Sequence, residues 1–167
     1  MNGKQRVRAA MTFGTPDRLP LHFESMGMSD YSYANWNQIG TGDHMKSRTV
    51  DEWGCTWARS EVKDMGLVIG HPLDDWGKLA TFRWPDPDDP AFYAGMDQQF
   101  EGSDGKFVQT GIFMVLFERM HSLRGFQNTL EDLYLERENI EALADRIAVI
   151  DLRIIRNIGN RFPGMID

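Results

Sequence analysis

Titratable side chains that could take part in proton transfer occur at two places in the first third of the sequence. His22 and Glu24 follow a short apolar run, and Asp51 and Glu52 stand beside Trp53. A carboxylate at such a place can act as a general acid or base, or it can hydrogen-bond a substrate N–H group. A carboxylate that only points into solvent from a loop is the alternative, and the sequence leaves both interpretations open.

Familiar catalytic and cofactor-binding motifs are absent from the sequence. It contains no Gly-x-Gly-x-x-Gly after a strand, no Walker-type phosphate loop and no Gly-x-Ser-x-Gly elbow. None of the four histidines belongs to a His-x-x-Glu or His-x-x-x-His pattern. Glu118 and His121 are three residues apart on a predicted helix, so we interpret them as neighbours on the helix surface, with a metal site as the alternative.

Two further groups of reactive side chains have simple structural interpretations. Cys55 is the only cysteine, so it has no partner for a disulfide within the chain. We interpret it as a small buried apolar side chain, with a catalytic thiol as the alternative. Asp86, Asp88 and Asp89 are interleaved with prolines. This pattern is typical of turns and helix capping, with a metal cluster as the alternative.

Composition excludes several classes of protein. The chain has 167 residues with 25 acidic against 18 basic side chains, a net charge of −7, which argues against a nucleic-acid footprint. No apolar run is long enough to span a bilayer, and the N-terminus lacks the apolar core of a secretory signal. We therefore expect a cytoplasmic protein without nucleic-acid or membrane partners.

Hydrophobic periodicity predicts the elements that must position these side chains. The expected helices and strands alternate along the chain: a helix over 3–12, a strand over 19–23, a hairpin-like pair over 50–61 and 65–70, a helix over 91–100, a strand over 106–113, helices over 114–123 and 127–134, and a long helix over 137–160. Such alternation favours an α/β fold with a mainly parallel sheet covered by helices, either doubly wound or a barrel. Residues 165–167 begin another apolar segment, so we expect an architecture that stops part-way.

A series of motifs resembles a known family. In order they are RVRAAMTFGTPDRLPL, DEWGCTW, GHPLDDW, WPDPDDPAF, TGIFMVLFERMHSLRGFQNTLEDLYLERENIEALADRI and RFPGMID. The series is similar to the N-terminal half of the uroporphyrinogen decarboxylase superfamily, closest to the divergent branch related to the corrinoid- and coenzyme-M-directed methyltransferases. The resemblance implies a partial (β/α)8 TIM barrel, in which residues 1–167 form the incomplete N-terminal portion of a single domain with mainly parallel strands and covering helices.

The resemblance also implies roles for particular residues. Asp51 matches the aspartate that family decarboxylases direct at pyrrole N–H groups, so it is expected to be catalytic. Substrate-binding positions at the carboxyl ends of the strands and after them are His22, Glu24, Trp53, Phe113 and Arg119. The family's Arg-x-x-Gly-Arg segment is matched by residues 23–28, which lack both arginines. Since Glu24 would repel a polycarboxylate porphyrinogen, literal uroporphyrinogen decarboxylation is not expected.

The expected function follows from the family. Full-length relatives decarboxylate tetrapyrroles or transfer methyl groups from a corrinoid to a thiol, with a corrinoid protein as a partner of the methyltransferases. No cofactor is expected in this segment, and zinc would belong to a C-terminal half that is absent. The chain alone would then be inactive. The alternative is a non-catalytic assembly partner, as a homo-oligomer or with a second half-barrel chain.

A physical expectation accompanies the half-barrel interpretation. Half a barrel leaves strand edges unpaired and apolar faces uncovered. The strand over 106–113 and the Ile-rich face of the helix over 137–160 should then lack full cover.

Overall fold

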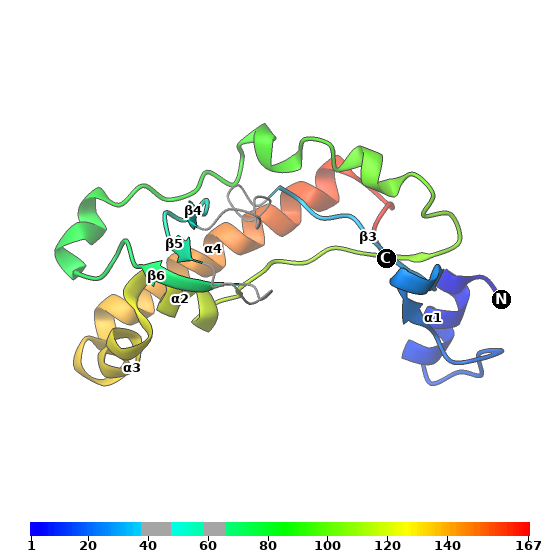
Figure 1. Ribbon diagram of the computed structural model, residues 1–167, viewed down its shortest axis with the longest axis horizontal. Helices are drawn as coiled ribbons and strands as arrows, with labels where there is room; N and C mark the ends of the chain where they lie inside the picture. Colours follow the sequence, from blue (N-terminus) through cyan, green and yellow to red (C-terminus); the bar gives the residue numbers. More distant parts are fainter. Residues whose placement is uncertain (38–47, 59–65) are drawn as a thin grey trace. The chain divides into compact units, whose positions relative to one another are not determined.

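The computed structural model describes residues 1–37, 48–58 and 66–167 (Figure 1). The chain divides into two compact units. Unit 1 consists of Met1–Asn37, Tyr93–Gly111 and Arg156–Asp167, and unit 2 consists of Gln38–Phe92 and Ile112–Ile155. Buried apolar side chains occur in both units, among them Val7 and Met96 in unit 1 and Leu73 and Leu123 in unit 2. In the described parts of the chain, no helix is long and apolar enough to cross a membrane.

Unit 1 combines one helix with short strands. Its elements are α1 (Gly3–Met11), β1 (His22–Phe23), the 3-10 helix η1 (Glu24–Met26), β2 (Met28–Ser29), β3 (Tyr31–Tyr33), the 3-10 helix η4 (Asp97–Phe100) and β7 (Phe107–Gln109). Helix α1 begins with a capping box, because Asn2 accepts from the N–H of Gln5 and the Gln5 side chain accepts from the N–H of Asn2. Strands β3 and β7 pair in parallel, and β1 pairs with β2 antiparallel.

A buried ion network holds the N-terminal part of unit 1. The carboxylate of Asp30 accepts hydrogen bonds from Arg6 at 2.6 Å, from Arg18 at 2.7 Å and from the backbone N–H of Leu21 at 2.7 Å. Both Arg6 and Asp30 are buried, so the several donors compensate the cost of removing these charges from water. The network ties α1 to the segment that precedes β1.

Unit 2 contains an antiparallel sheet and a group of helices. Its elements are β4 (Arg48–Val50), β5 (Thr56–Ala58), β6 (Leu67–Gly70), the 3-10 helix η2 (Trp76–Thr81), α2 (Phe117–Arg124) and α3 (Phe126–Leu135). The three strands form one sheet in the order β4-β5-β6. Gly125 separates α2 from α3 with a φ of 93°, a left-handed value that glycine adopts without strain.

Helix α4 (Arg137–Arg161) is the longest element, and its part up to Ile155 belongs to unit 2. The apolar stripe that predicted it is buried, with at most 3% of any side chain exposed: Ile140, Leu143, Ile147, Ile150, Ile154 and Ile158. The prediction of this helix is confirmed. The expectation that its Ile-rich face lacks cover is wrong. The same expectation for the strand over 106–113 holds only in part, because Phe107 and Val108 are buried whereas Phe113 is 37% exposed.

The expected partial (β/α)8 TIM barrel with mainly parallel strands is wrong. Among the described residues the sheets have two or three strands, and β3 with β7 is the one parallel pair. Parallel neighbours require a crossover connection, usually a helix, whereas β4, β5 and β6 pair antiparallel. The predicted first strand shortens to the two exposed residues of β1, and the strand over 106–113 shortens to β7.

The α-helix expected over 91–100, in the segment between β6 and β7, does not form. Instead of an α-helix, this region forms two 3-10 helices, η3 (Pro90–Tyr93) and η4. A proline lacks the N–H that an α-helix interior needs, and Pro85, Pro87 and Pro90 precede or begin this region. No strand is assigned at 165–167, where the N–H of Asp167 donates to Val108 O at 3.0 Å. The helices expected at 3–12 and 127–134 and the hairpin-like pairing of β5 with β6 are confirmed. The helix expected over 114–123 is confirmed as α2, which begins only at Phe117, because Met114 and Leu116 have positive φ values.

Candidate acid–base site

Asp51 organises the turn between β4 and β5. Its N–H donates to Cys55 O at 3.0 Å, and the N–H of Gly54 donates to Asp51 O at 2.9 Å. Its side-chain Oδ1 accepts from the N–H groups of Trp53 at 3.0 Å and Cys55 at 2.8 Å. Short polar side chains favour turns because they accept such local backbone N–H bonds. Gly54, at a φ of 78°, supplies the left-handed residue that the turn requires.

The second oxygen of Asp51 joins this turn to α2. Oδ2 accepts from Nε1 of Trp57 at 2.9 Å and from Nη1 of Arg119 at 2.8 Å. The Arg119 side chain is 2% exposed, and its Cζ lies 5.0 Å from the centre of the Trp53 ring. A carboxylate offers about four lone-pair directions, and Asp51 receives four donors. Asp51 is therefore saturated, and Arg119 is held between a carboxylate and an aromatic face.

Glu52 differs from its neighbour because neither oxygen of its buried carboxyl has a hydrogen-bond partner among the residues that the structure describes. Its side chain is 2% exposed, and Oε1 lies 3.7 Å from Nη2 of Arg119, beyond hydrogen-bond distance. Burial raises the pKa of Glu52 to about 7, with the charge of Arg119 opposing and that of Asp51 adding to the rise. At neutral pH this carboxyl exists in both protonation states, so it can give or take a proton.

A third carboxyl belongs to the same group. Asp151 of α4 is buried, and burial raises its pKa to about 6, opposed by the charge of Arg119. The positive charge of Arg119 thus acts on three acids: Asp51, Glu52 and Asp151. Because full ionisation would leave two uncompensated negative charges in a buried place, ionisation of Glu52 and Asp151 is disfavoured, and both groups titrate above their ordinary pKa values.

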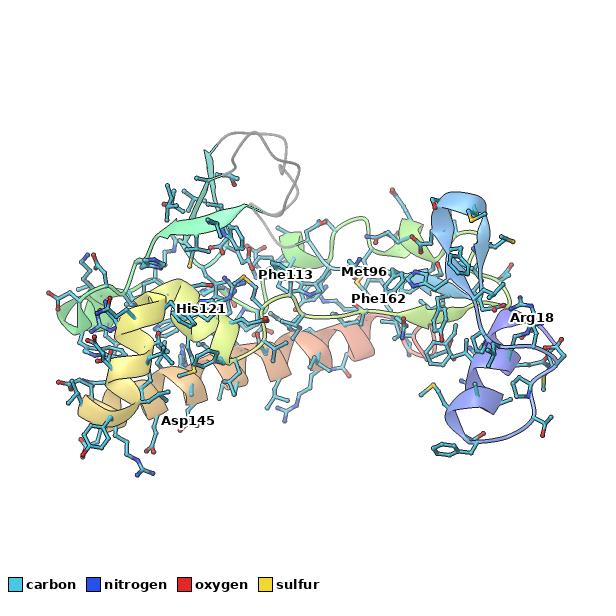
Figure 2. The ribbon with its side chains drawn as sticks, turned by 60° about the horizontal axis from the view of Figure 1, so that its bottom comes forward. Arg18, Met96, Phe113, His121, Asp145 and Phe162 are labelled. Atoms are coloured by element: carbon cyan, nitrogen blue, oxygen red, sulfur yellow. The ribbon has the colours of Figure 1, made fainter. Side chains whose placement is uncertain are left out.

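Aromatic rings surround this group within unit 2. The rings of Trp53 and Trp84 are 6.4 Å apart and edge to face, and those of Trp57 and Phe113 are 6.3 Å apart. Phe113 is labelled in the side-chain view of Figure 2. The guanidinium of Arg146 lies 5.5 Å from the centre of the Trp84 ring. Such rings exclude water from the charged groups and strengthen the electrostatic interactions among them.

The structure places the sequence-predicted site residues in two groups. Asp51, Trp53 and Arg119 contact one another, and Phe113 is linked to Asp51 through Trp57. The other two predicted residues belong to unit 1, where Nε2 of His22 lies 3.6 Å from Oε1 of Glu24 and both side chains are largely exposed. The His22 ring also lies 5.4 Å from that of Tyr33. Their assignment to substrate binding stays a prediction.

Cys55 and the histidines of unit 2 take structural positions. The Cys55 thiol is fully buried and donates to Ser122 O at 3.3 Å, and burial raises the pKa of that thiol, which keeps it protonated. Nδ1 of His71 bonds the same carbonyl at 2.8 Å. The ring of His121, labelled in Figure 2, lies 5.6 Å from that of Phe117, and burial lowers the pKa of this histidine.

The described residues do not fit a metal centre. Within residues 1–37, 48–58 and 66–167, no group of three or more His, Cys, Asp or Glu side chains has the geometry to hold a metal ion. Asp86 accepts from the N–H of Asp88 at 3.0 Å, and Asp89 accepts from the N–H of Ala91 at 2.9 Å. The interpretation as turn and capping residues is confirmed for Asp86 and Asp89, whereas the carboxylate of Asp88 pairs with Arg153 at 2.9 Å. Zinc is therefore not assigned to any described residue, and no reaction step depends on it.

Two residues of the site are difficult to recognise in the sequence. Glu52 was grouped with Asp51 and Trp53, but nothing in its type distinguishes a buried, unpartnered carboxyl from a solvated one. Asp151 was missed, although a signal existed. It follows Ile147 by four residues and precedes Ile154 by three, so it stands on the apolar face of the helix. Burial of a single acid on an apolar helix face costs free energy unless a nearby positive charge compensates for it.

Comparison with known proteins identifies no relative of this chain. No family model, no curated protein and no solved structure matches it.

Proposed function

We propose that this chain takes part in a carboxy-lyase or methyltransferase reaction of the uroporphyrinogen decarboxylase superfamily, and that Glu52 is the group that exchanges the proton. The substrate would be a tetrapyrrole, or a corrinoid-borne methyl group with a thiol acceptor and a corrinoid protein as partner. The motif series supports the relationship. The single observation that carries the proton-transfer role is the buried carboxyl of Glu52, which lies beside Arg119 and has no hydrogen-bond partner among the described residues.

The two reaction types use the same group in opposite directions. In a decarboxylation the C–C bond to CO2 breaks, the electron pair stays on the remaining carbon, and Glu52 in its acid form donates the proton that this carbon needs. In a methyl transfer the acceptor thiol would lose its proton to the Glu52 carboxylate and its sulfur would take the methyl group, while the carbon–cobalt bond of the methyl donor breaks and leaves its electron pair on the donor. A general acid or base works best when its pKa lies near the working pH, and that of Glu52 is about 7.

Asp51 and Arg119 then act as positioning residues. The four donors around Asp51 leave it no free lone-pair direction for a substrate N–H, so its expected catalytic role passes to Glu52 in this proposal. Arg119 stabilises the ionised form of Glu52 after proton release, because their charged groups lie 3.7 Å apart.

A Glu52→Gln variant tests the proposal. The expected inactivity of the chain alone depended on the half-barrel, which the structure contradicts, so activity is measured on the chain itself. Because Glu24 argues against uroporphyrinogen, decarboxylation of less carboxylated porphyrinogens and methyl transfer from methylcobalamin to a thiol would be measured for the wild-type chain and the variant between pH 5 and 9. We expect kcat to fall about 100-fold or more in the variant while KM stays similar, since general acid–base groups contribute roughly 10² to 10⁴. Glu118→Gln is the matched control, because Glu118 is exposed on α2 beside Arg119.

Quenching of tryptophan fluorescence separates binding from chemistry in the same experiment. Trp53, Trp57 and Trp84 lie in or beside the site, so a ligand that enters it changes their emission. Neither turnover nor quenching with either substrate would contradict the proposal. Equal turnover by wild type and Glu52→Gln would contradict the role of Glu52.

A second candidate function is that of a non-catalytic assembly partner. The observation in its favour is the set of large apolar side chains that lie exposed on α3: Phe126, Leu130, Leu133 and Tyr134. Exposed apolar patches of this kind mark interaction surfaces. A pure partner has no activity for the Glu52→Gln substitution to remove, which distinguishes it from an enzyme.

A further inference from the structure

Helix α3 presents its apolar side to solvent. Its buried side chains are the polar Thr129 and Asp132, which bond to Gly125 O at 2.8 Å and to Nε of Arg124 at 2.6 Å, respectively. Its apolar residues recur at four, seven and eight positions from the first and are 47% to 88% exposed: Phe126, Leu130, Leu133 and Tyr134. This arrangement is the reverse of a helix on the surface of an isolated domain, which buries its apolar side.

Helix α4 carries a second exposed apolar stripe in the same unit. Val149, Leu152 and Ile155 are three residues apart and each is more than half exposed. They lie away from the buried isoleucine stripe of the same helix. Unit 2 thus has two apolar surfaces: the α3 face (Phe126, Leu130, Leu133 and Tyr134) and the α4 stripe (Val149, Leu152 and Ile155). Both helices are labelled in Figure 1.

The charges beside these surfaces have opposite signs. Glu131, Glu136 and Glu138 are exposed on and directly after α3 and outnumber the exposed Arg137, whereas Arg146 and Arg153 are exposed beside the α4 stripe and outnumber the exposed Asp145. Arg153 also pairs with Asp88 at 2.9 Å, an exposed pair of a kind that contributes little. Two α3 faces placed against each other would bring acids together. An α3 face placed on an α4 stripe would bring opposite charges together, which favours this pairing.

We propose that the α3 face of one copy of this chain packs on the α4 stripe of a second copy. The inference rests on the assembly function and does not involve Glu52. The contact joins two different surfaces, so it is heterologous: in a pair, one copy keeps its α4 stripe free and the other keeps its α3 face free. Repetition produces closed rings or open chains whose size grows with concentration.

Complementation between two variants tests this geometry by size-exclusion chromatography with light scattering. We expect the wild-type chain to form species larger than 19.2 kDa that grow with concentration. Leu133→Glu removes the α3 face and Leu152→Glu removes the α4 stripe, so each variant alone should be monomeric. Their equimolar mixture retains one intact surface of each kind, so it should form a dimer with twice the chain mass. Leu67→Glu, at an exposed position of β6, is the matched control and should assemble like the wild type.

Three results would overturn the proposal: a wild-type chain that is monomeric at every concentration, a mixture that does not combine, and a Leu152→Glu chain that still dimerises. The last result would mean that α3 faces pair with each other. Circular dichroism checks that each variant is folded. Leu130→Glu and Val149→Glu probe the same two surfaces a second time. Because Glu52→Gln leaves both surfaces intact, its effect on activity is read independently of assembly.

Discussion

The guanidinium of Arg119 donates to the carboxylate of Asp51 over 2.8 Å, with both side chains almost completely removed from solvent. The pair links α2 to the β4–β5 turn, which are separated by more than sixty residues of sequence. A buried pair of this kind contributes little compared with a well-packed apolar pair, but it is costly to break on one side. This asymmetry determines how the site responds to substitution.

Removing Arg119 should destabilise the chain strongly. Arg119→Met leaves the Asp51 carboxylate buried without its cation, and we expect a loss of about 3–5 kcal/mol in the free energy of unfolding, measured with urea. The double variant Asp51→Asn/Arg119→Met should lose less than the sum of the single changes. Arg137→Met removes an exposed pair with Glu141 and is the control, with no measurable loss expected. Additive losses in the double variant would show that the two residues do not interact.

Stability should fall as the pH rises through the neutral range. The folded-state pKa values of Glu52 and Asp151, about 7 and about 6, lie above their ordinary values of 4.5 and 3.8. The folded chain therefore binds more protons than the unfolded chain between about pH 4 and 7, and its stability decreases with pH in that window. Urea midpoints at pH 5, 6, 7 and 8 measure this effect.

The Glu52→Gln variant separates the contribution of Glu52 from that of Asp151. A neutral amide has no charge to bury, so the variant should be more stable than the wild type at pH 8 and should show a flatter dependence on pH. The contribution of Glu52 is on the order of 3 kcal/mol from its change in pKa. Parallel pH profiles for the two chains would show that Glu52 titrates normally.

Acid should weaken unit 1 through Asp30. Hydrogen bonds from Arg18, opposed by burial and supported by the N–H of Leu21 and by Arg6, lower the pKa of Asp30 below its ordinary value of 3.8. Its stabilising contribution is present above pH 4 and is lost as the pH falls below that value. Asp30→Asn should lower the melting temperature at pH 7 and leave it nearly unchanged at the lowest accessible pH. An equal decrease at both pH values would exclude the ion network as its cause.

The Cys55 thiol should be unreactive in the folded chain. It is fully buried, and burial raises its pKa, so little of the nucleophilic thiolate is present at pH 8. We expect negligible reaction with a chromogenic disulfide reagent until denaturant is added, when one thiol per chain should react. Fast labelling under native conditions would show that the thiol is reactive and would support the alternative that Cys55 is a catalytic residue.

The sequence predicted the helices well because their signals are local. The Ile147-centred stripe of α4 and the Gly125 break between α2 and α3 depend on residues three or four positions apart. The barrel prediction failed because it required strand pairing over long distances, which no local pattern determines. The segment around Pro90 shows the difference: its capping acids were recognised correctly, but the prolines divided the expected helix into 3-10 turns.

Most residues of the site could be predicted from the sequence, but the protonation behaviour of Glu52 could not. Asp51, Trp53 and Arg119 were named from sequence, and the structure brings them together. The property that distinguishes Glu52 is a buried carboxyl that lies beside Arg119 but has no hydrogen-bond partner among the described residues, and that arrangement depends on the packing of α2 against the turn. A residue type cannot reveal it, because the same glutamate in solvent would have an ordinary pKa.

The four donors of Asp51 have a consequence for how unit 2 opens. Two come from the β4–β5 turn, one from β5 and one from α2, so neither the hairpin nor the helix can detach without leaving a buried charge unpaired. The turn and α2 should therefore unfold as one cooperative element. In native-state hydrogen exchange, the amides of Cys55 and Met120 should exchange with the same free energy of opening, although they belong to different kinds of secondary structure.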